Sequence, residues 1–377
     1  MNPGLYLHIP FCEQRCYYCA FTVAVSPEHT FEPYVRRLVR EIELSGFGDS
    51  PGTIFFGGGT PSLIPASLLE RILCAVPAGK ATEISIEVNP GTLSPEKVSR
   101  YRDLGINRVS LGAQSLEDEE LLRAGRLHNA AAVYADFELL RQAGFTNINL
   151  DLIAGLPNQE LKTWTRNLDG ALKLRPEHIS IYMLDREERS AWAKLPPGIP
   201  EESDFAEFYT EAESRLGAAG YLHYEISNWA LPGLECRHNV GYWSGAPYRG
   251  FGVGAHSYDG FRRFWNTTSL GEYADLIDSG QLPVLGEETL TPLLRLEEAF
   301  MLGLRQACGL DVGAVAKRLG LEYPPEWWVR VEQLRGAGWI QFDGTILQLT
   351  AKGRLAANSV TGELIWPTPS STYEAIP

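Results

Sequence analysis

Three cysteines lie close together near the start of the chain, at Cys12, Cys16 and Cys19, with the spacing C-x3-C-x2-C. Three thiolates on one short loop can bind three irons of a [4Fe–4S] cubane, whereas such clusters normally take four thiolates. One iron would then keep an open position for a small molecule, as the metal does in a catalytic zinc site. A zinc site or a chance grouping is the alternative, although zinc usually takes a fourth ligand, and no second C-x-x-C or pair of histidines is nearby.

A second group of chemically useful residues lies at the ends of later β-rich runs. The segment 56–62 (FGGGTPS) is rich in glycine, which lets backbone groups approach a ligand, but a tight loop explains the same residues. Carboxylates, amides and a guanidinium can bind ammonium, hydroxyl and carboxylate groups. Singly, each such residue also fits a solvated strand end, but on successive strands they predict the rim of a pocket. They are Glu87, Asn89, Gln114, Ser115, Arg126 and Asp151.

These residues can meet only if the strands that carry them lie side by side. Short β-rich runs alternate with longer helical patterns, and about six β–α units in series predict an α/β fold with a parallel sheet and right-handed crossovers. A doubly wound open sheet and a partial or complete barrel both fit, but the chain lacks the G-x-G-x-x-G pattern typical of dinucleotide-binding open sheets. The predicted strands are 5–9, 53–56, 83–88, 108–111, 147–153, 178–184 and 221–226, and the predicted helices include 34–44, 66–75, 159–172, 205–216 and one that begins at Ser94.

The character of the chain changes after residue 285. Helical patterns come first and two short β-rich runs follow, at 296–306, 312–319, 327–336, 339–342 and 346–349. Asp343-Gly344 between the two β-rich runs is typical of a hairpin. We therefore predict a small winged-helix-like domain over 286–367, a core over 1–285 and a disordered tail over 368–377.

Composition limits the classes of partner. The chain has 377 residues, 44% of them hydrophobic, which suffices for a large core. Its formal net charge of -14 repels phosphate backbones, so we expect no nucleic-acid partner. No apolar run reaches the roughly 20 residues of a membrane helix, and no secretion signal is present, so we expect a cytoplasmic protein with at most peripheral membrane contact. Because Cys74 and Cys308 lie within apolar helical patterns, we expect both to be buried structural thiols.

The cysteine motif after an N-terminal strand resembles the signature of the radical SAM superfamily, in which the open iron binds S-adenosylmethionine (SAM). There, one electron from the cluster cleaves SAM to methionine and a 5′-deoxyadenosyl radical. The order Y-x-H-I-P-F-C, GGGTP, E-x-N-P, L-G-x-Q-S, G-R-x-H and D-L-I-x-G-L-P resembles the oxygen-independent coproporphyrinogen dehydrogenase family along nearly the whole chain. The resemblance implies a partial or complete β/α (TIM-like) barrel, an electron donor protein and a set of SAM contacts. That set is Tyr6, Tyr18, Gly58, Gly59, Thr60, Glu87, Gln114, Arg126 and Asp151.

Two features separate the chain from the dehydrogenases of this family. Their motif extends to C-x3-C-x2-C-x-C, but Phe21 occupies the position of that last cysteine. Because the motif begins at Cys12, we also expect no long N-terminal segment to cover a substrate. Both features resemble the HemW branch, whose members are regarded as heme chaperones. The resemblance implies that the chain binds heme and delivers it to an acceptor protein; the alternative is an enzyme, an oxygen-independent coproporphyrinogen III dehydrogenase.

The segment 237–243 (RHNVGYW) matches the H-N-x-x-Y-W motif of that branch. Imidazole is a common axial ligand of heme iron, and aromatic rings suit a flat macrocycle, so His238 is the first candidate ligand. A hydrogen-bonded structural histidine packed by Tyr242 and Trp243 is the alternative. His256 is the next candidate, and covalent attachment of heme to Cys236 is a further one.

Overall fold

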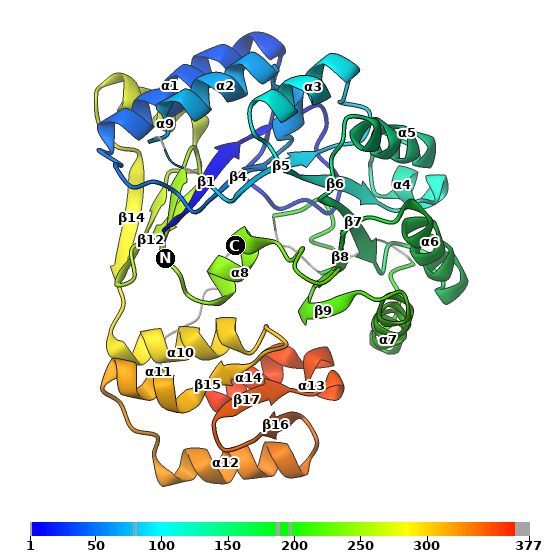
Figure 1. Ribbon diagram of the computed structural model, residues 1–377, viewed down its shortest axis with the longest axis vertical. Coiled ribbons are helices and arrows are strands. Elements are labelled where there is room, and N and C mark those ends of the chain that lie inside the picture. The colour runs from blue at the N-terminus through cyan, green and yellow to red at the C-terminus, as the bar shows by residue number, and fades with distance from the viewer. Residues whose placement is uncertain are drawn as a thin grey trace.

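The computed structural model describes residues 2–365 apart from residues 78, 80, 186–188, 195 and 197. Its largest element is a 12-stranded sheet. In Figure 1, helices from the first half of the chain lie around the outside of the strands, and the orange and red C-terminal elements form a second lobe. The tail predicted to be disordered, 368–377, lies outside the described residues.

Six strands predicted from the sequence form the parallel middle of the large sheet. Each neighbouring pair is parallel, and the strands follow one another in chain order. They are β1 (Gly4–Ile9), β4 (Thr53–Gly58), β5 (Glu83–Val88), β6 (Arg108–Gln114), β7 (Ile148–Ala154) and β8 (His178–Met183). Among these six strands the order never reverses, as in a β/α barrel and unlike the parallel strands of a doubly wound sheet, so the barrel-like alternative is confirmed.

Shorter strands extend the sheet at both edges. They are β9 (Leu222–Glu225), β10 (Asn228–Ala230), β11 (Tyr248–Phe251), β12 (His256–Tyr258), β13 (Arg262–Asn266) and β14 (Val284–Thr289). β11 is parallel to β1, whereas the other added strands pair antiparallel with their neighbours. The full order is β14-β13-β12-β11-β1-β4-β5-β6-β7-β8-β10-β9. Because β14 and β9 end the sheet without pairing to each other, the described chain forms a partial barrel.

Amphipathic helices cover the outer face of the parallel strands (Figure 1). α1 (Phe31–Leu44) buries Leu38 and Ile42, which lie one helical turn apart on the same face. The helix after β5 begins at Ser94, as predicted, because Ser94 Oγ accepts the backbone N–H of Lys97 at 3.2 Å. In the described ranges every helix is too short or too polar to cross a membrane. The other helices of this layer include α2 (Ala66–Ala75), α3 (Pro95–Asp103), α5 (Ala130–Gln142), α6 (Leu161–Leu174) and α7 (Glu202–Ala218).

The C-terminal part has a hydrophobic core of its own, centred on Phe300, Trp327 and Leu347. Its elements include α10 (Pro292–Gly303), α11 (Val312–Leu319), α12 (Pro325–Gly336), β16 (Ile340–Phe342) and β17 (Ile346–Leu349). The predicted hairpin turn forms at Asp343, whose Oδ1 accepts the backbone N–H of Ile346 at 2.7 Å. The small C-terminal domain expected from the sequence, with helices before a hairpin, is therefore present.

The expectation that Cys74 and Cys308 are buried was wrong, because both side chains are exposed. Cys74 lies near the end of α2, outside the buried face that Leu69 and Ile72 form. Cys308 lies in the turn after α10, which ends at Gly303, earlier than the predicted helix 296–306. An apolar pattern does not bury the residues at or beyond the end of a helix, where the backbone leaves the core.

Candidate functional site

Cys12 ends β2 (Phe11–Cys12), and Cys16 and Cys19 lie on the loop that leads from it to β3 (Ala24–Val25). All three thiols are free and half-buried. Burial raises the pKa of Cys12 to about 11, and the charges of the other two cysteines act in the same direction. Burial also raises the pKa of Cys19, with Cys16 again adding to the shift. The three sulfurs are therefore within electrostatic range of one another.

The three candidate ligands on this loop are all sulfur atoms. Within the part of the chain that the structure describes, no three or more His, Cys, Asp or Glu side chains come close enough together to hold a single metal ion. Three thiolates alone would leave a zinc ion without the fourth ligand that structural zinc sites usually have. An all-sulfur set spread over one loop fits an iron–sulfur cluster better than it fits zinc.

The loop is fixed against the end of α4 (Asp118–Arg123). Gln14 Nε2 donates to the backbone oxygen of Gly125 at 3.0 Å, and the backbone N–H of Tyr17 donates to that of Ala124 at 3.2 Å. A Cβ atom on Gly125 would lie 3.1 Å from the Tyr17 ring, so glycine permits this close packing. The position of the cysteines therefore depends on α4 as well as on β1.

Arg126 ties the loop to the strand ends. Its Nη1 donates to Cys16 Sγ and to the Tyr18 hydroxyl, both at 3.4 Å. Its Nη2 donates to Asn89 Oδ1 and to the backbone oxygen of Gly112, both at 2.9 Å. Family resemblance implies a SAM contact for Arg126; in this structure its guanidinium bonds the cysteine loop. Its Nε is buried and, among the described residues, has no hydrogen-bond partner.

The same network reaches a second cysteine through Asn89. Asn89 Nδ2 donates to Thr60 Oγ1 at 2.9 Å, and Thr60 Oγ1 donates to Cys12 Sγ at 3.6 Å. A continuous chain of contacts therefore joins Cys12 to Cys16 through Thr60, Asn89 and Arg126. The sequence identifies Asn89 only as a strand-end amide, and its place in E-x-N-P is the signal that marks it as part of the site.

The glycine segment 57–60 is hydrogen-bonded to the residues that lead into the cysteine loop. The backbone N–H groups of Gly59 and Thr60 donate to the oxygens of Ile9 and Phe11 at 2.9 and 2.8 Å. A Cβ atom on Gly59 would lie 2.7 Å from the Phe11 oxygen, so only glycine fits between the two backbones. These N–H groups serve the protein's own strands.

Gly58 packs against a buried histidine. Its φ is +118°, and a Cβ atom there would lie 2.7 Å from the His8 ring. His8 Nε2 donates to the backbone oxygen of Thr22 at 2.8 Å, so its Nδ1 accepts the Tyr6 hydroxyl at 3.1 Å. Burial lowers the pKa of His8 to about 4, which keeps the ring neutral. His8 therefore joins β1 to the end of the cysteine loop.

Two carboxylates interact inside the barrel. Glu87 Oε2 accepts the backbone N–H of Gly58 at 3.1 Å. Burial and, second, the charge of Asp151 raise the pKa of Glu87 to about 8. Asp151 accepts hydrogen bonds from Ser110 Oγ at 3.0 Å and Asn149 Nδ2 at 2.8 Å. An acid that is mostly protonated at neutral pH thus neighbours a carboxylate with two donors.

The end of β6 separates two residues that the sequence analysis placed on one rim. Gln114 has a φ of 66° and follows a register shift, and its Nε2 would lie 3.0 Å from a Cβ atom on Gly112. That position is beside Asn89, whose Oδ1 would lie 3.4 Å from the same Cβ atom. Ser115 instead leaves the rim, because its Oγ donates to Glu120 Oε2 at 2.7 Å.

Comparisons with known proteins agree with this arrangement. The model of the Radical SAM superfamily matches residues 6–169, and that of the HemN C-terminal domain matches residues 290–356. A Bacillus subtilis (strain 168) protein named heme chaperone HemW is 35% identical over 96% of this chain and 98% of its own length. A protein of the same name from Mycobacterium tuberculosis (strain ATCC 25618 / H37Rv) is 36% identical over 96% of this chain and 94% of its own.

The chain belongs to the HemW family. The branch predicted from the motifs is therefore confirmed. Among solved structures, coproporphyrinogen III oxidase (HemN) from Escherichia coli, described as a radical SAM enzyme, aligns with a TM-score of 0.85 at 24% identity. The alignment covers 97% of this chain and 90% of that one, which confirms the α/β radical SAM fold.

In this HemW-family chain, the H-N-x-x-Y-W segment forms α8 (Arg237–Trp243). His238 is 3% exposed, and both ring nitrogens have partners. Nδ1 lies 2.8 Å from Thr53 Oγ1, and Nε2 lies 2.9 Å from the Tyr242 hydroxyl. The ring also stacks on Phe55 with centroids 5.2 Å apart. Because Thr53 begins β4, His238 lies at the opposite strand ends from the cysteine loop.

The neighbours of His238 differ in how available they are to a ligand. Cys236 is fully buried with its Sγ 3.6 Å from Glu83 Oε1, which leaves no path for covalent attachment of heme in this conformation. His256 is half-buried and stacks on Trp265 with centroids 5.9 Å apart. In the described part of the chain no hydrogen bond to the His256 ring is found, so its nitrogens are freer than those of His238.

Proposed function

We propose that this chain is a heme chaperone that binds heme and transfers it to an acceptor protein, and that it carries a [4Fe–4S] cluster with exchangeable SAM. The observation that carries this proposal is similarity along almost the whole chain, at 32–36% identity over 94–96% of it, to proteins named heme chaperone HemW. Phe21, where the dehydrogenases have a further cysteine, supports the chaperone over the enzyme; its side chain is 69% exposed.

Cys12, Cys16 and Cys19 are the proposed cluster ligands. When bound, the cluster supplies the electron for reductive cleavage of SAM, and its open iron takes SAM. The chain's own contribution is electrostatic and positional. Arg126 and Thr60 donate to two of the three sulfurs, which stabilises thiolate over thiol. An electron donor protein remains part of the proposal.

The proposed SAM contacts are the residues named by family resemblance. Glu87 and Asp151 would take cationic and hydroxyl groups, because they are the acidic pair inside the barrel. The N–H groups of Gly59 and Thr60 are already used, so their part would be to offer carbonyl oxygens to an ammonium group. Besides Glu87 and Asp151, the proposed set contains Tyr6, Tyr18, Gly58, Gly59, Thr60, Gln114 and Arg126.

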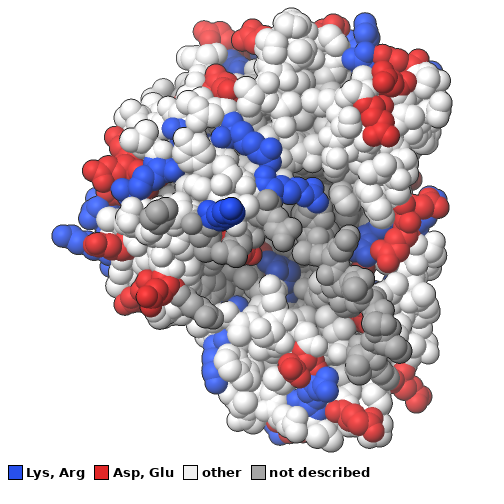
Figure 2. Space-filling view, turned by 180° about the vertical axis from the view of Figure 1, so that it is seen from behind, with Lys and Arg blue, Asp and Glu red and all other residues white. Residues whose placement is uncertain are grey.

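Heme carries two anionic propionates, so its docking surface should be positively charged. Figure 2 shows several Lys and Arg side chains toward the middle of one face, while most Asp and Glu side chains lie toward its edge. Basic side chains attract carboxylates such as the heme propionates, even on a chain with a net charge of -14. The charge distribution on this face therefore supports heme as the cargo.

His238 remains the proposed axial ligand on one condition. Since Tyr242 occupies Nε2, the tyrosine hydroxyl must move before that nitrogen can bind iron. His256 needs no such change and is the alternative. We also propose that the boundary between the barrel and the C-terminal domain lies near residue 285, which the two separate hydrophobic cores support. We further propose that the protein is cytoplasmic.

The decisive experiment is anaerobic incubation of the reconstituted protein with heme and, separately, with coproporphyrinogen. We expect about one heme per chain, transfer to an apo-heme protein, and no decarboxylation. His238→Ala and His256→Ala should each be titrated with heme, and the true ligand will shift the Soret band. Coproporphyrinogen turnover by the wild type would overturn the chaperone assignment.

A further inference from the structure

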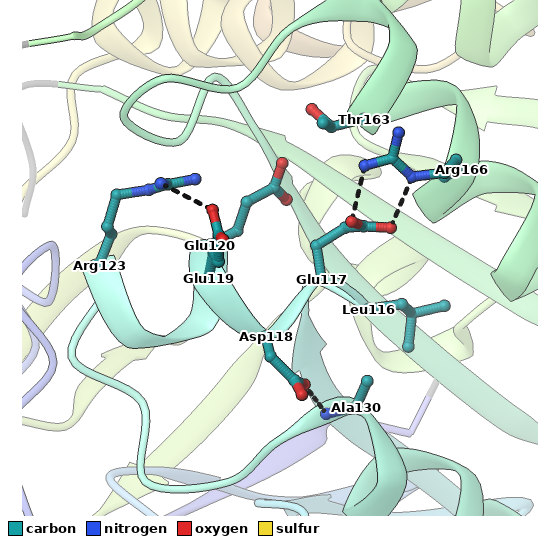
Figure 3. A pocket seen from close by; sticks show the side chains of 9 residues that line it. All are labelled: Leu116, Glu117, Asp118, Glu119, Glu120, Arg123, Ala130, Thr163 and Arg166. Atoms are coloured by element: carbon teal, nitrogen blue, oxygen red, sulfur yellow. Dashed lines mark hydrogen bonds and ion pairs between the residues drawn. The ribbon is translucent and has the colours of Figure 1, made fainter.

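Asp151 is held in a different way from the acidic side chains on the outside of the barrel. In the cleft between α4 and α6, Arg166 Nε and Nη2 donate to the two oxygens of Glu117 at 2.9 and 2.7 Å (Figure 3). Asp151 lies on β7, is half-buried, and forms no ion pair with any residue that the structure describes. Its donors Ser110 and Asn149 are neutral. A network of neutral side chains therefore holds this carboxylate.

The amide that donates to Asp151 is itself held by a buried histidine. Asn149 Nδ2 lies 2.8 Å from Asp151 Oδ1, and Asn149 Oδ1 lies 2.6 Å from His178 Nδ1. Because an ionised carboxylate only accepts hydrogen bonds, the amide nitrogen must face Asp151. The amide oxygen then faces His178. This ring is fully buried, and burial holds its pKa well below the usual value, so it is neutral and carries its one proton on Nδ1.

The contacts on either side of this pair have the same direction. With its proton on Nδ1, His178 can only accept at Nε2, which lies 2.8 Å from the Tyr224 hydroxyl. That hydroxyl accepts the backbone N–H of Cys236 at 3.4 Å, so its own proton is available to His178. Ser110 Oγ accepts from Asn149 Nδ2 at 2.7 Å and donates to Asp151 at 3.0 Å. Every donor in the series thus points toward Asp151.

This direction matters because the surroundings of Asp151 oppose its charge. Burial raises the pKa of Asp151, whereas side-chain hydrogen bonds and the charge of Arg108 act in the opposite direction. The donors of those hydrogen bonds are Ser110, Ser180 and Asn149. A carboxylate has about four lone-pair positions, so a position remains for a ligand after these donors are bound.

We propose that His178 is a positioning residue of the SAM site: its Nδ1–H fixes the orientation of Asn149, and Asn149 holds Asp151 for a hydroxyl or ammonium group of SAM. This inference rests on the proposed SAM contact of Asp151. His178 and Asn149 lie directly opposite each other on β8 and β7. The series begins at Tyr224 on β9, whose backbone oxygen accepts the N–H of Ala307 at 2.9 Å. It therefore starts where the C-terminal part of the chain meets the barrel.

Nitrogen-15 NMR of the full chain, labelled at histidine, tests the direction of the series without a ligand. We expect the His178 ring, identified by the signals lost in His178→Asn, to have a protonated Nδ1 and an unprotonated Nε2. Tyr224→Phe removes the hydroxyl that donates to Nε2, so it should shift the Nε2 signal and leave Nδ1 protonated. A wild-type ring protonated on Nε2 would overturn the proposal.

Equilibrium binding of SAM to the reconstituted protein tests the positioning role. His178→Leu removes the donor to Asn149 and should weaken SAM binding about 10-fold. His178→Asn keeps an N–H near the position of Nδ1 and should restore most of that affinity. Because His178 acts only through Asn149, the double variant His178→Leu/Asn149→Leu should bind SAM no more weakly than Asn149→Leu alone.

The control is Val331→Ala, in the separate core of the C-terminal part. It should lower stability and leave both SAM affinity and the His178 signals unchanged. Unchanged affinity in His178→Leu, or additive losses in the double variant, would overturn the positioning role and leave the SAM site in place. Absence of SAM binding to the wild type would overturn the SAM site and the positioning role together.

Discussion

Arg126 offers a direct test of how the chain tunes its cysteine loop. Its guanidinium donates to Cys16 Sγ at 3.4 Å and is half-buried, so water screens it less than it screens a surface charge. A positive charge beside a cluster ligand favours the reduced, more negative cluster. Replacing Arg126 with Met removes that charge with little change in length, so we expect the reduction potential of the reconstituted cluster to fall.

The size of the shift follows from the contact. Hydrogen bonds to charged groups contribute about 1.5–3 kcal/mol. For a one-electron couple, about 1.4 kcal/mol corresponds to about 59 mV, so the contact corresponds to about 60–130 mV. This range is a ceiling, because the added electron spreads over the whole cluster. Redox titration followed by electron paramagnetic resonance, on samples with equal iron content, measures the shift.

Arg123→Met is the matched control. Arg123 lies three residues earlier, at the end of α4, and its guanidinium lies 3.6 Å from Glu119. It should leave the potential unchanged, and Arg126→Lys should restore part of the loss. An unaltered potential in an Arg126→Met protein with full iron and sulfide content would refute this electrostatic role.

Three further predictions follow from the same geometry. Cys16→Ala should abolish the reconstituted cluster, measured as iron and sulfide per chain, whereas exposed Cys74→Ser should retain it; a cluster that survives without Cys16 contradicts the ligand set. Because the pKa of Glu87 is about 8, its ionised form appears as pH rises through that value, so SAM affinity measured by equilibrium binding should increase from about pH 7 to 9. Glu87→Gln should flatten that profile, and a flat profile in the wild type would count against Glu87 as a contact. Gly58→Ala should lower the free energy of unfolding in urea by about 1–3 kcal/mol, since φ is +118° and the new Cβ would meet His8. Gly217→Ala in α7, where a Cβ meets nothing within 4 Å, should be neutral or stabilising, and equal effects in both would refute the strain argument.

The sequence by itself determined the parallel strands of the barrel and the cysteine motif. Residues 83–88 were predicted as a strand with the bounds that β5 has, because an apolar β-rich run between turns carries its own signal. The spacing of the three cysteines is equally local, since it concerns one short loop. The hydrophobic periodicity of the sequence predicted the edges of the sheet less well, because β10 and β12 there have only three residues each. Pairing with neighbours, rather than propensity, forms such short strands.

Only the tertiary structure decided which side chains meet. Arg126 and Cys16 are 110 residues apart in sequence, and no local pattern states that their side chains touch. The same holds for His238, whose Nδ1 finds Thr53 across 185 residues and becomes part of a packed interior. Residue types and motifs state what a side chain can do. Whether its nitrogen or sulfur is free to do so depends on partners brought from distant strands, because burial obliges each polar atom to find one.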